Sequence, residues 1–236
     1  MLGQLRDLAP LSPSEVETAF AVAAREILLG SQLVVGDDAC HVLEVEFYFH
    51  GPNHPDPFAH QHAIQSLFGR WYFHRVGTGY RGGSFKGVDV TFGDDGCFGG
   101  MLLRTLESPD EVICGPSLCV DYMLARTGFA KPEQLDAEIQ SRDAWDVSSP
   151  LHFEHKEQND KTMFRCARVG LSTKGLSTSD HPDEFINKHY RFLAEPRKIK
   201  KGRAELIRGL AAAKYSLEEI HELTGSPRKT IQRHAF

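Results

Sequence analysis

The sequence lacks the features that mark membrane proteins, secreted proteins and zinc fingers. No apolar run approaches the roughly 20 residues needed to cross a bilayer, and no basic stretch followed by an apolar core opens the chain. The five cysteines are odd in number and form no C-x-x-C pair, which argues against both a disulfide framework and a finger-type zinc site. We therefore expect an intracellular protein of the cytoplasm, nucleoid or nucleus, without a membrane partner.

Repeats and low-complexity segments are also missing, and the composition is that of an ordinary globular protein. The 236 residues are 41% hydrophobic and 25% charged, enough for one sizeable domain with a small appendage. We predict a main domain over residues 1–200 and a basic C-terminal segment over residues 201–236.

Positive charge is scarce in the body of the chain and concentrated near its C-terminal end. Residues 187–236 hold twelve Lys or Arg against five Asp or Glu, a net of +7, which leaves −12 on the first 186 residues of a chain with net charge −5. A basic end on an acidic body is typical of a protein whose end meets a polyanion. The alternative is that basic helices simply present solvated faces.

The C-terminal segment reads as three short helices. RAELIRGLAAAKY (203–215) is followed by SLEEIHELTG (216–225) and SPRKTIQRH (226–234), with Ser216 and Ser226 as N-caps. The last two helices have helix-turn-helix spacing. We predict that Arg228, Lys229 and Arg233 contact nucleic acid, although a basic helical hairpin packed on the body would give the same pattern.

The N-terminal region carries a clear helix signal. Ser12 can cap the helix, Pro13 suits its first position, and Glu15 can complete a capping box. Apolar residues recur at helical spacing up to Ile27, and Gly30 is a plausible stop.

A strand with strict alternation follows at residues 43–50. Its first set of side chains, Leu43, Val45, Phe47 and Phe49, should face the core. The other face then aligns two acids, a phenol and an imidazole: Glu44, Glu46, Tyr48 and His50.

Further strands are predicted at residues 31–35, 99–107, 162–171 and 189–193, and further helices at residues 117–126 and 132–140. This order predicts an α+β protein. We expect a mostly antiparallel β-sheet with a barrel-like core and flanking helices, followed by the small C-terminal helical unit.

The histidine-rich stretch at residues 50–62 raises the question of a metal. His50, His54, His60 and His62 lie close together in sequence, and His60-x-His62 could supply two ligands. Zinc, however, needs three or four converging ligands on a rigid element, and neither H-E-x-x-H nor a cysteine pair completes the set. We therefore predict no metal site, while a zinc-dependent hydrolase that uses this cluster remains an alternative.

The paired acids Glu44 and Glu46 suit another chemistry. Breaking a C–N or C–O bond at an anomeric carbon builds positive charge on the sugar, which a carboxylate can stabilise while it deprotonates the attacking water. The alternative is a half-exposed strand that carries its charges on the wet side.

Several motifs resemble a known family. AREILLGSQLV (24–34) and HVLEVEFYFHGPNHPDPFAH (41–60) resemble the opening of the alkyladenine (3-methyladenine) DNA glycosylase family, which reads A-R-x-L-L-G-x-x-L, I-V-E-T-E-A-Y and D-P-A-S-H. GTGYRGGSFKGVDVTFGDDGCFGGMLLRTLESP (77–109), GPSLC (115–119), RVGLSTKG (168–175) and KHYRFL (188–193) are similar to later family motifs. The similarity runs in order from about residue 20 to about residue 195.

The resemblance implies specific roles. Glu46 falls on the family's catalytic acid, which activates water, and Arg104 on its arginine near that water. Tyr48 and His60 fall on residues that stack against or hydrogen-bond the extruded base. No lysine matches a nucleophile, which implies direct hydrolysis without a Schiff base and without a cofactor, on a nucleotide flipped out of the stack.

The sequence also departs from the family. Phe85 is the candidate for the wedge that replaces the flipped base, and a glycine stands where the family has another stacking aromatic. The purine-discriminating asparagine falls near Thr91 or Phe92, so we expect a pocket with a different base preference. Arg81 and Lys86 are candidates for phosphate contacts.

The sequence therefore predicts a monofunctional DNA N-glycosylase that excises a damaged or modified base from DNA. We expect its substrate to be duplex DNA and the protein to act as a monomer. An inactive relative that only binds a modified base or DNA is the second alternative, although the retention of Glu46, Tyr48, His60 and Arg104 argues against it.

Overall fold

The computed structural model describes residues 2–139, 142–176 and 182–235 and has the predicted α+β architecture. The helices are α1 (Pro13–Gly30), α2 (Pro116–Thr127), α3 (Pro132–Ile139), α4 (Pro182–Ile186), α5 (Arg203–Ala212), α6 (Leu217–Thr224) and α7 (Arg228–Ala235). The strands are β1 (Ser31–Val35), β2 (Asp38–Gly51), β3 (His54–Pro55), β4 (Trp71–Phe73), β5 (Arg75–Val76), β6 (Gly79–Tyr80), β7 (Val88–Thr91), β8 (Phe98–Glu107), β9 (Val112–Cys114), β10 (Leu151–His155), β11 (Phe164–Cys166) and β12 (Arg191–Leu193). No helix in these described ranges is long and apolar enough to cross a membrane.

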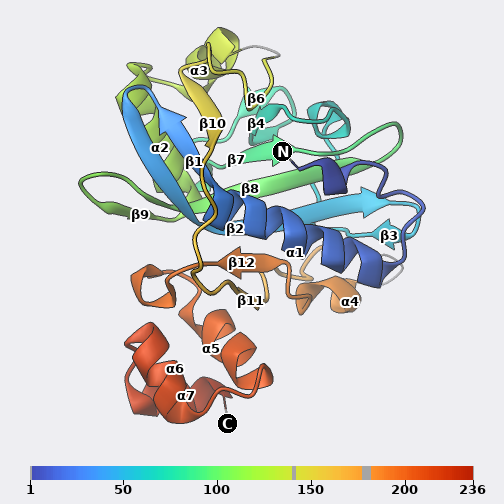
Figure 1. Ribbon diagram of the computed structural model, residues 1–236. Helices are drawn as coiled ribbons and strands as arrows, with labels where there is room; N and C mark the ends of the chain where they lie inside the picture. The colour runs from blue at the N-terminus through green and yellow to red at the C-terminus, as the bar shows by residue number, and fades with distance from the viewer. Residues whose placement is uncertain (1, 140–141, 177–181, 236) are drawn as a thin grey trace.

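Ten of the strands form one antiparallel sheet built around β2 and β8 (Figure 1). The main path runs β10-β1-β2-β8-β7-β4, while β3 and β12 pair with β2, β9 pairs with β8, and β11 pairs with β12. The predicted antiparallel sheet is thus confirmed, but it is open and does not close into a barrel. The barrel-like part of the expectation was wrong, because β4 and β10 end the main path at opposite edges without pairing with each other.

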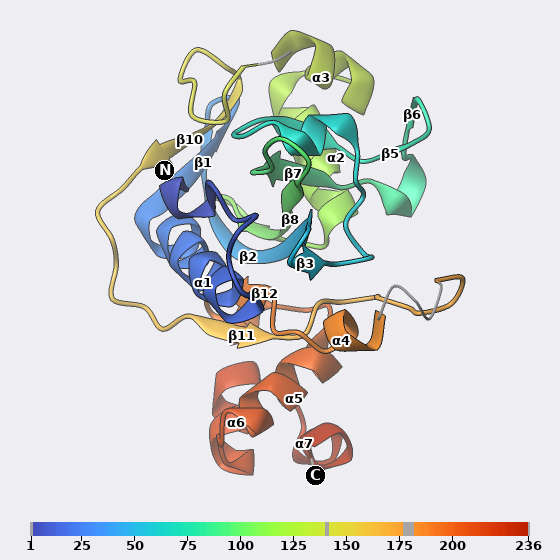
Figure 2. The same cartoon turned by 90° about the vertical axis from the view of Figure 1, so that its right-hand side faces the viewer.

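Helix α1 covers one face of the sheet (Figure 2). It begins as predicted: Pro13 follows the Ser12 cap, and the Ser12 amide donates to Glu15 Oε2 at 2.8 Å to complete the capping box. The Phe20 ring of α1 stacks on the Phe47 ring of β2, with ring centroids 4.7 Å apart. The odd-numbered side chains of β2 near Phe47 therefore point towards α1, and the even-numbered side chains point to the opposite face.

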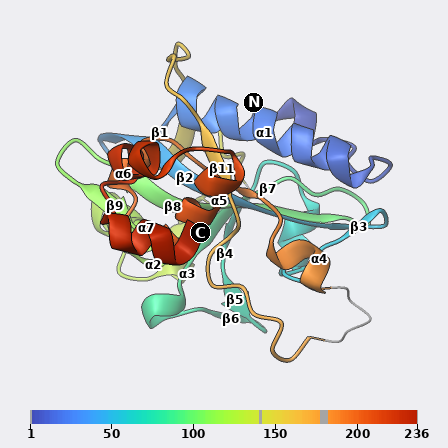
Figure 3. The ribbon, with the colours of Figure 1, turned by 90° about the horizontal axis from the view of Figure 1, so that it is seen from below.

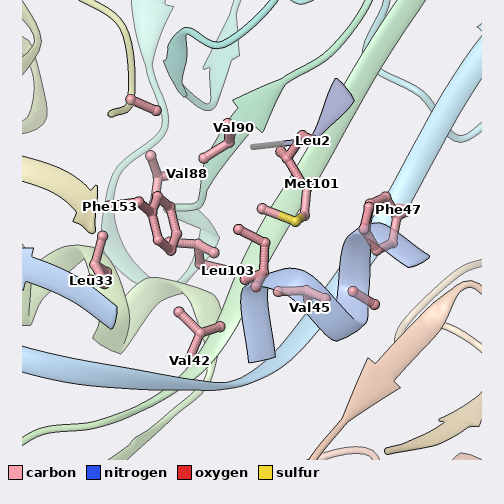
Figure 4. Packing of buried hydrophobic residues seen from close by; sticks show 14 of the residues in the cluster. Leu2, Leu33, Val42, Val45, Phe47, Val88, Val90, Met101, Leu103 and Phe153 are labelled. Atoms are coloured by element: carbon pink, nitrogen blue, oxygen red, sulfur yellow. The ribbon is translucent and has the colours of Figure 1, made fainter. Parts of the chain in front are cut away.

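The core between α1 and the sheet is continuous and apolar (Figure 4). It includes Val45, Phe47, Met101 and Leu103 from the two central strands, all at 0% exposure. Burial of this kind contributes roughly 25 cal/mol per Å² of apolar surface removed from water. This layer fixes β2 and β8 as a rigid base for the opposite face.

A β-bulge breaks the alternation of β2. The register with β8 shifts between Val42 and Glu44 and again between Glu44 and Val45. As a result, Leu43 leaves the core under α1 and joins a second apolar cluster with residues of the C-terminal helices. The prediction that Leu43 shares a face with Val45 was wrong for this reason.

The C-terminal helices gather below the sheet (Figure 1), and the view from below shows α5 beside β11 (Figure 3). Their apolar side chains, including Leu206, Ile220 and Ile231, pack in the second cluster with Leu43 and Cys166 of the body. The three predicted helices are confirmed. Because they cover a buried patch of the body, removal of residues 203–236 would expose this apolar cluster.

Candidate active site

The face of the sheet opposite α1 carries a pocket with a volume of about 810 Å³. Figure 2 shows that the β5–β6 hairpin lies on this side, away from α1. Pocket-lining residues come from segments far apart in sequence. The predicted site residues among them are Tyr48, His60, Arg81, Phe85, Lys86 and Arg104.

The strand register explains why two acidic residues, Glu46 and Asp89, share this face of the sheet. Glu46 of β2 pairs with Leu102 of β8, which pairs with Asp89 of β7, which in turn pairs with Tyr72 of β4. Directly paired residues point to the same face of a sheet. Neighbouring strands are about 4.8 Å apart, so the Glu46 and Asp89 backbones stand roughly 10 Å apart across one face.

Glu46 is fully buried and held by three donors. Tyr48 donates its hydroxyl to Glu46 Oε2 at 2.8 Å, Arg104 donates to the same oxygen at 3.2 Å, and the Val169 amide donates to Oε1 at 2.7 Å. Tyr48, Arg104 and Val169 all line the pocket. The Glu46 carboxylate therefore lies directly behind the pocket wall, in contact with three of the residues that line it.

Glu44, two residues before Glu46 on β2, supports the same cluster. Its Oε1 accepts from Arg104 Nε at 3.0 Å and from Arg191 Nε at 2.6 Å, and Thr105 donates to its Oε2. Burial raises the pKa of Glu44, but the charges of Arg191 and Arg104 outweigh it, so its pKa lies below the ordinary value. The alternative that this strand face carries its charges in solvent was wrong, because Glu44 and Glu46 are 1% and 0% exposed.

Arg104 is fixed between the two acids. Burial lowers its pKa, but the charges of Glu46 and Glu44 more than compensate, and the net shift is upward. Its guanidinium is thus a permanent cation at the pocket wall. Because a guanidinium does not lose a proton in a protein, Arg104 cannot act as a general acid. It can orient neighbouring groups through its hydrogen bonds and stabilise negative charge.

The Tyr48 ring packs under a second buried arginine. The Arg168 guanidinium lies 4.5 Å from the centre of this ring. Burial and the nearby Glu46 raise the pKa of Tyr48 well above its ordinary value, so the phenol stays protonated and can donate to Glu46. Arg168 itself forms a bidentate ion pair with Asp56, at 2.5 and 3.2 Å.

This ion pair also explains a difference in strand length. The sequence predicts a strand over residues 162–171, but β11 ends at Cys166. Beyond it, Arg168 turns inward to Asp56, and the Val169 amide bonds to Glu46. The chain leaves the sheet because these two contacts draw it over the pocket.

His60 lines the same pocket and forms a cluster around Asp89 that the sequence did not reveal. Its ring centroid is 4.3 Å from that of His74, and His74 Nε2 lies 2.7 Å from Asp89 Oδ1. Desolvation by the pocket wall and the neighbouring His74 lower the pKa of His60 to about 4. His60 is therefore neutral at physiological pH.

The other histidines of the stretch take separate places. His54 is buried and bridges the Phe49 carbonyl and the Tyr190 hydroxyl, at 2.9 and 2.7 Å. His50 contacts the Asp56 carbonyl at 3.3 Å, and His62 stacks on Tyr72 with centroids 4.9 Å apart. The four histidines thus do not converge on one point.

The remaining predicted contacts divide into two groups. Phe85 is 72% exposed at the pocket rim, while Lys86 pairs with Asp121 at 2.9 Å. Thr91 does not reach the pocket: it is buried, its hydroxyl donates to the Leu67 carbonyl, and Asp89, two residues earlier on β7, lines the wall instead.

On the C-terminal unit, the predicted cations face solvent. Arg228, Lys229 and Arg233 are exposed on α7, whereas Ile231 between them is buried. Arg228 approaches Glu218 of α6 at 3.8 Å. Lys229 and Arg233 are thus the more available of the three for a polyanion.

Sequence reasoning missed His74, Asp89, Arg168 and Arg191 as members of this site. Each comes from a different strand or loop, so local spacing carries no signal for their convergence. Asp89 alone offered a hint, because it is a carboxylate within an otherwise apolar strand (VDVT).

Comparison with known proteins adds one relative. No family model matches this chain. Over 191 residues, which cover 74% of this chain and 85% of the other, it is 28% identical to "Uncharacterized protein L759" of Acanthamoeba polyphaga mimivirus. The name of that protein states no activity, so a functional proposal rests on the chemistry of the pocket.

Proposed function

We propose that this protein is a divergent relative of the alkyladenine DNA glycosylases, a monofunctional enzyme that flips a damaged or modified base out of DNA and hydrolyses its N-glycosidic bond. One observation carries the proposal. Residues assigned to the family's site from four separate sequence segments meet at one pocket, with the buried Glu46 behind its wall.

The pocket suits a single extruded nucleotide. Its volume of about 810 Å³ lies within the range of small-molecule sites. Tyr48 and Phe58 supply aromatic surface on its wall, and His60 supplies a polar ring. Enzymes that act on a base inside a duplex read the flipped base through such stacking and hydrogen bonds.

The hydrogen bonds around Glu46 suggest a path for the proton. A water molecule at the Tyr48 hydroxyl attacks C1′ of the sugar with its oxygen. The water gives a proton to the Tyr48 oxygen while the Tyr48 proton passes to Glu46 Oε2, 2.8 Å away. The C1′–N bond breaks with its electron pair on the departing base, which then takes a proton from solvent.

Arg104 has a positioning and electrostatic role in this proposal. It holds Glu46 at 3.2 Å and Glu44 at 3.0 Å, which fixes the acceptor oxygen against Tyr48. Phe85, exposed at the rim, is placed to fill the gap that a flipped base leaves. Arg81 and Lys86 on the same rim are candidates for contacts to the flanking phosphates.

The exposed cations of α7 extend the charged surface in this proposal. We expect the double variant Lys229→Ala/Arg233→Ala to bind duplex DNA more weakly. If both side chains contact phosphate, the slope of log K against log salt should flatten by about 0.9 per lost contact. Fluorescence anisotropy over a salt series measures it.

A charge-matched control is available on the body. Arg25 and Lys156 are also exposed, so Arg25→Ala/Lys156→Ala removes the same charge elsewhere. If both double variants change the slope equally, α7 has no specific role. These substitutions leave the apolar contacts of the helices intact, unlike a deletion of residues 203–236.

Activity is tested with a panel of oligonucleotides that carry alkylated, deaminated or hypermodified bases, in single and double strands. We expect one class of modified base to give abasic sites, detected as alkali-labile breaks at the position of that base. Glu46→Gln serves as the control. If no substrate yields abasic sites, the proposed function fails.

A further inference from the structure

The part of the pocket around Asp89, two strands away from Glu46, brings three metal-ligating side chains together. One ligand atom from each of His60, His74 and Asp89 lies within 4.8 Å of the other two. It is the one such group found among the described residues. We propose that these three residues bind a divalent transition-metal ion, of which zinc is the first candidate.

The donor set fits this class of ion. Two imidazoles and one carboxylate form the protein part of many catalytic zinc and non-haem iron sites, which leave a coordination position open. Calcium and magnesium prefer oxygen ligands, so the two imidazoles select against them. The exposed position of His60 and the buried position of Asp89 give the site one side towards the cavity.

The surrounding chain makes room for these groups. A Cβ at Gly87 would stand 2.6 Å from the His74 ring, and a Cβ at Gly100 would stand 2.5 Å from Asp89 Oδ2. Both positions therefore need glycine for the two ligands to lie where they do.

An outer hydrogen bond also orients the carboxylate. Gln65 donates its side-chain amide to Asp89 Oδ2 at 3.0 Å, which leaves Oδ1 directed at His74. Metal-binding carboxylates are commonly held by such a second partner. The paired atoms of His74 and Asp89, now 2.7 Å apart, need to separate only to about 3.3 Å to share a tetrahedral zinc.

A bound ion would contact the base of the flipped nucleotide. An ion there could accept an electron pair from a nitrogen or oxygen of a base and withdraw charge as the base departs. This role rests on the proposed function. The binding of the ion does not, because it follows from the three side chains alone.

Zinc binding to the purified, chelator-treated protein tests the proposal by calorimetry and by metal analysis after dialysis. We expect one zinc per chain, and with cobalt as a probe a visible absorption spectrum typical of tetrahedral coordination. Loss of a residue that only orients a metal ligand typically lowers metal affinity by about 10- to 100-fold. We expect Gln65→Ala to lower zinc affinity within that range. Asp89→Asn and His60→Asn should each lower it by more.

His62→Asn is the matched control, because His62 lies on the same stretch and stacks on Tyr72 without joining the cluster. It should bind zinc like the wild type. Circular dichroism confirms that each variant is folded. The absence of stoichiometric zinc in the wild type, or equal affinity in His60→Asn and His62→Asn, overturns the proposal. Either result leaves the release of bases by Glu46 open to its own test.

Discussion

Glu46→Gln should lower the rate of base release by about 10²- to 10⁴-fold, the usual contribution of a general base. Gln keeps the shape of the side chain, and its one carbonyl oxygen can still accept from the Val169 amide, which bonds to Glu46 Oε1 at 2.7 Å. It cannot take up the proton that Tyr48 passes on. Single-turnover kinetics with excess enzyme isolate this step from product release.

Two further variants sharpen this test. Tyr48→Phe removes the hydroxyl that bonds to Glu46 at 2.8 Å and should slow the same step. Glu154→Gln makes the same chemical change at a half-exposed acid of β10 and should leave the rate unchanged. If Glu46→Gln releases base as fast as Glu154→Gln, Glu46 is not the base.

The second large effect concerns stability. Glu44→Gln should lower the free energy of unfolding at pH 7 by about 3–5 kcal/mol, the cost of removing one partner of a buried ion pair. The variant leaves Arg104 and Arg191, at 6% and 0% exposure, without their shared counter-charge. Denaturant unfolding monitored by circular dichroism measures the loss.

The same contact makes a prediction for pH. Because the folded-state pKa of Glu44 lies below its unfolded value, its ionised form stabilises the fold fully above the unfolded pKa of about 4.3. This stabilisation is lost as the pH falls towards the folded-state pKa. The difference between wild type and Glu44→Gln should therefore be largest near pH 7 and shrink below about pH 4.3.

Glu195→Gln is the control for this pair of predictions. Glu195 also accepts from two cations, Lys161 and Lys198, but its side chain is 22% exposed and both lysines are more exposed still. Such surface pairs contribute about 0–1 kcal/mol. Equal losses in Glu44→Gln and Glu195→Gln, or a difference that does not change with pH, would contradict the role of Glu44.

Local patterns predicted the elements that carry the site. The capping residues Ser12, Pro13 and Glu15 placed the start of α1, and alternation placed Glu46 and Tyr48 on the face opposite Phe47. These signals are short-range: a cap is read within one turn, and alternation within one strand. They suffice to orient a side chain relative to its own element.

Long-range pairing could not be predicted in this way. The burial of Glu44 depends on Arg191, which is 147 residues away in sequence, and the bulge that turns Leu43 aside depends on the register with β8. The convergence of His60, His74 and Asp89 depends on how a loop lies over two paired strands. A single sequence does not show which positions vary together, so it gives no information on these long-range contacts.

Base release in water enriched in ¹⁸O, followed by mass spectrometry of both products, tests the central claim most directly. The account predicts a free base of unchanged mass and an abasic strand that carries the heavy oxygen at C1′, because water attacks the sugar. Heavy oxygen in the base, or a modified base that stays attached to its strand, would contradict it.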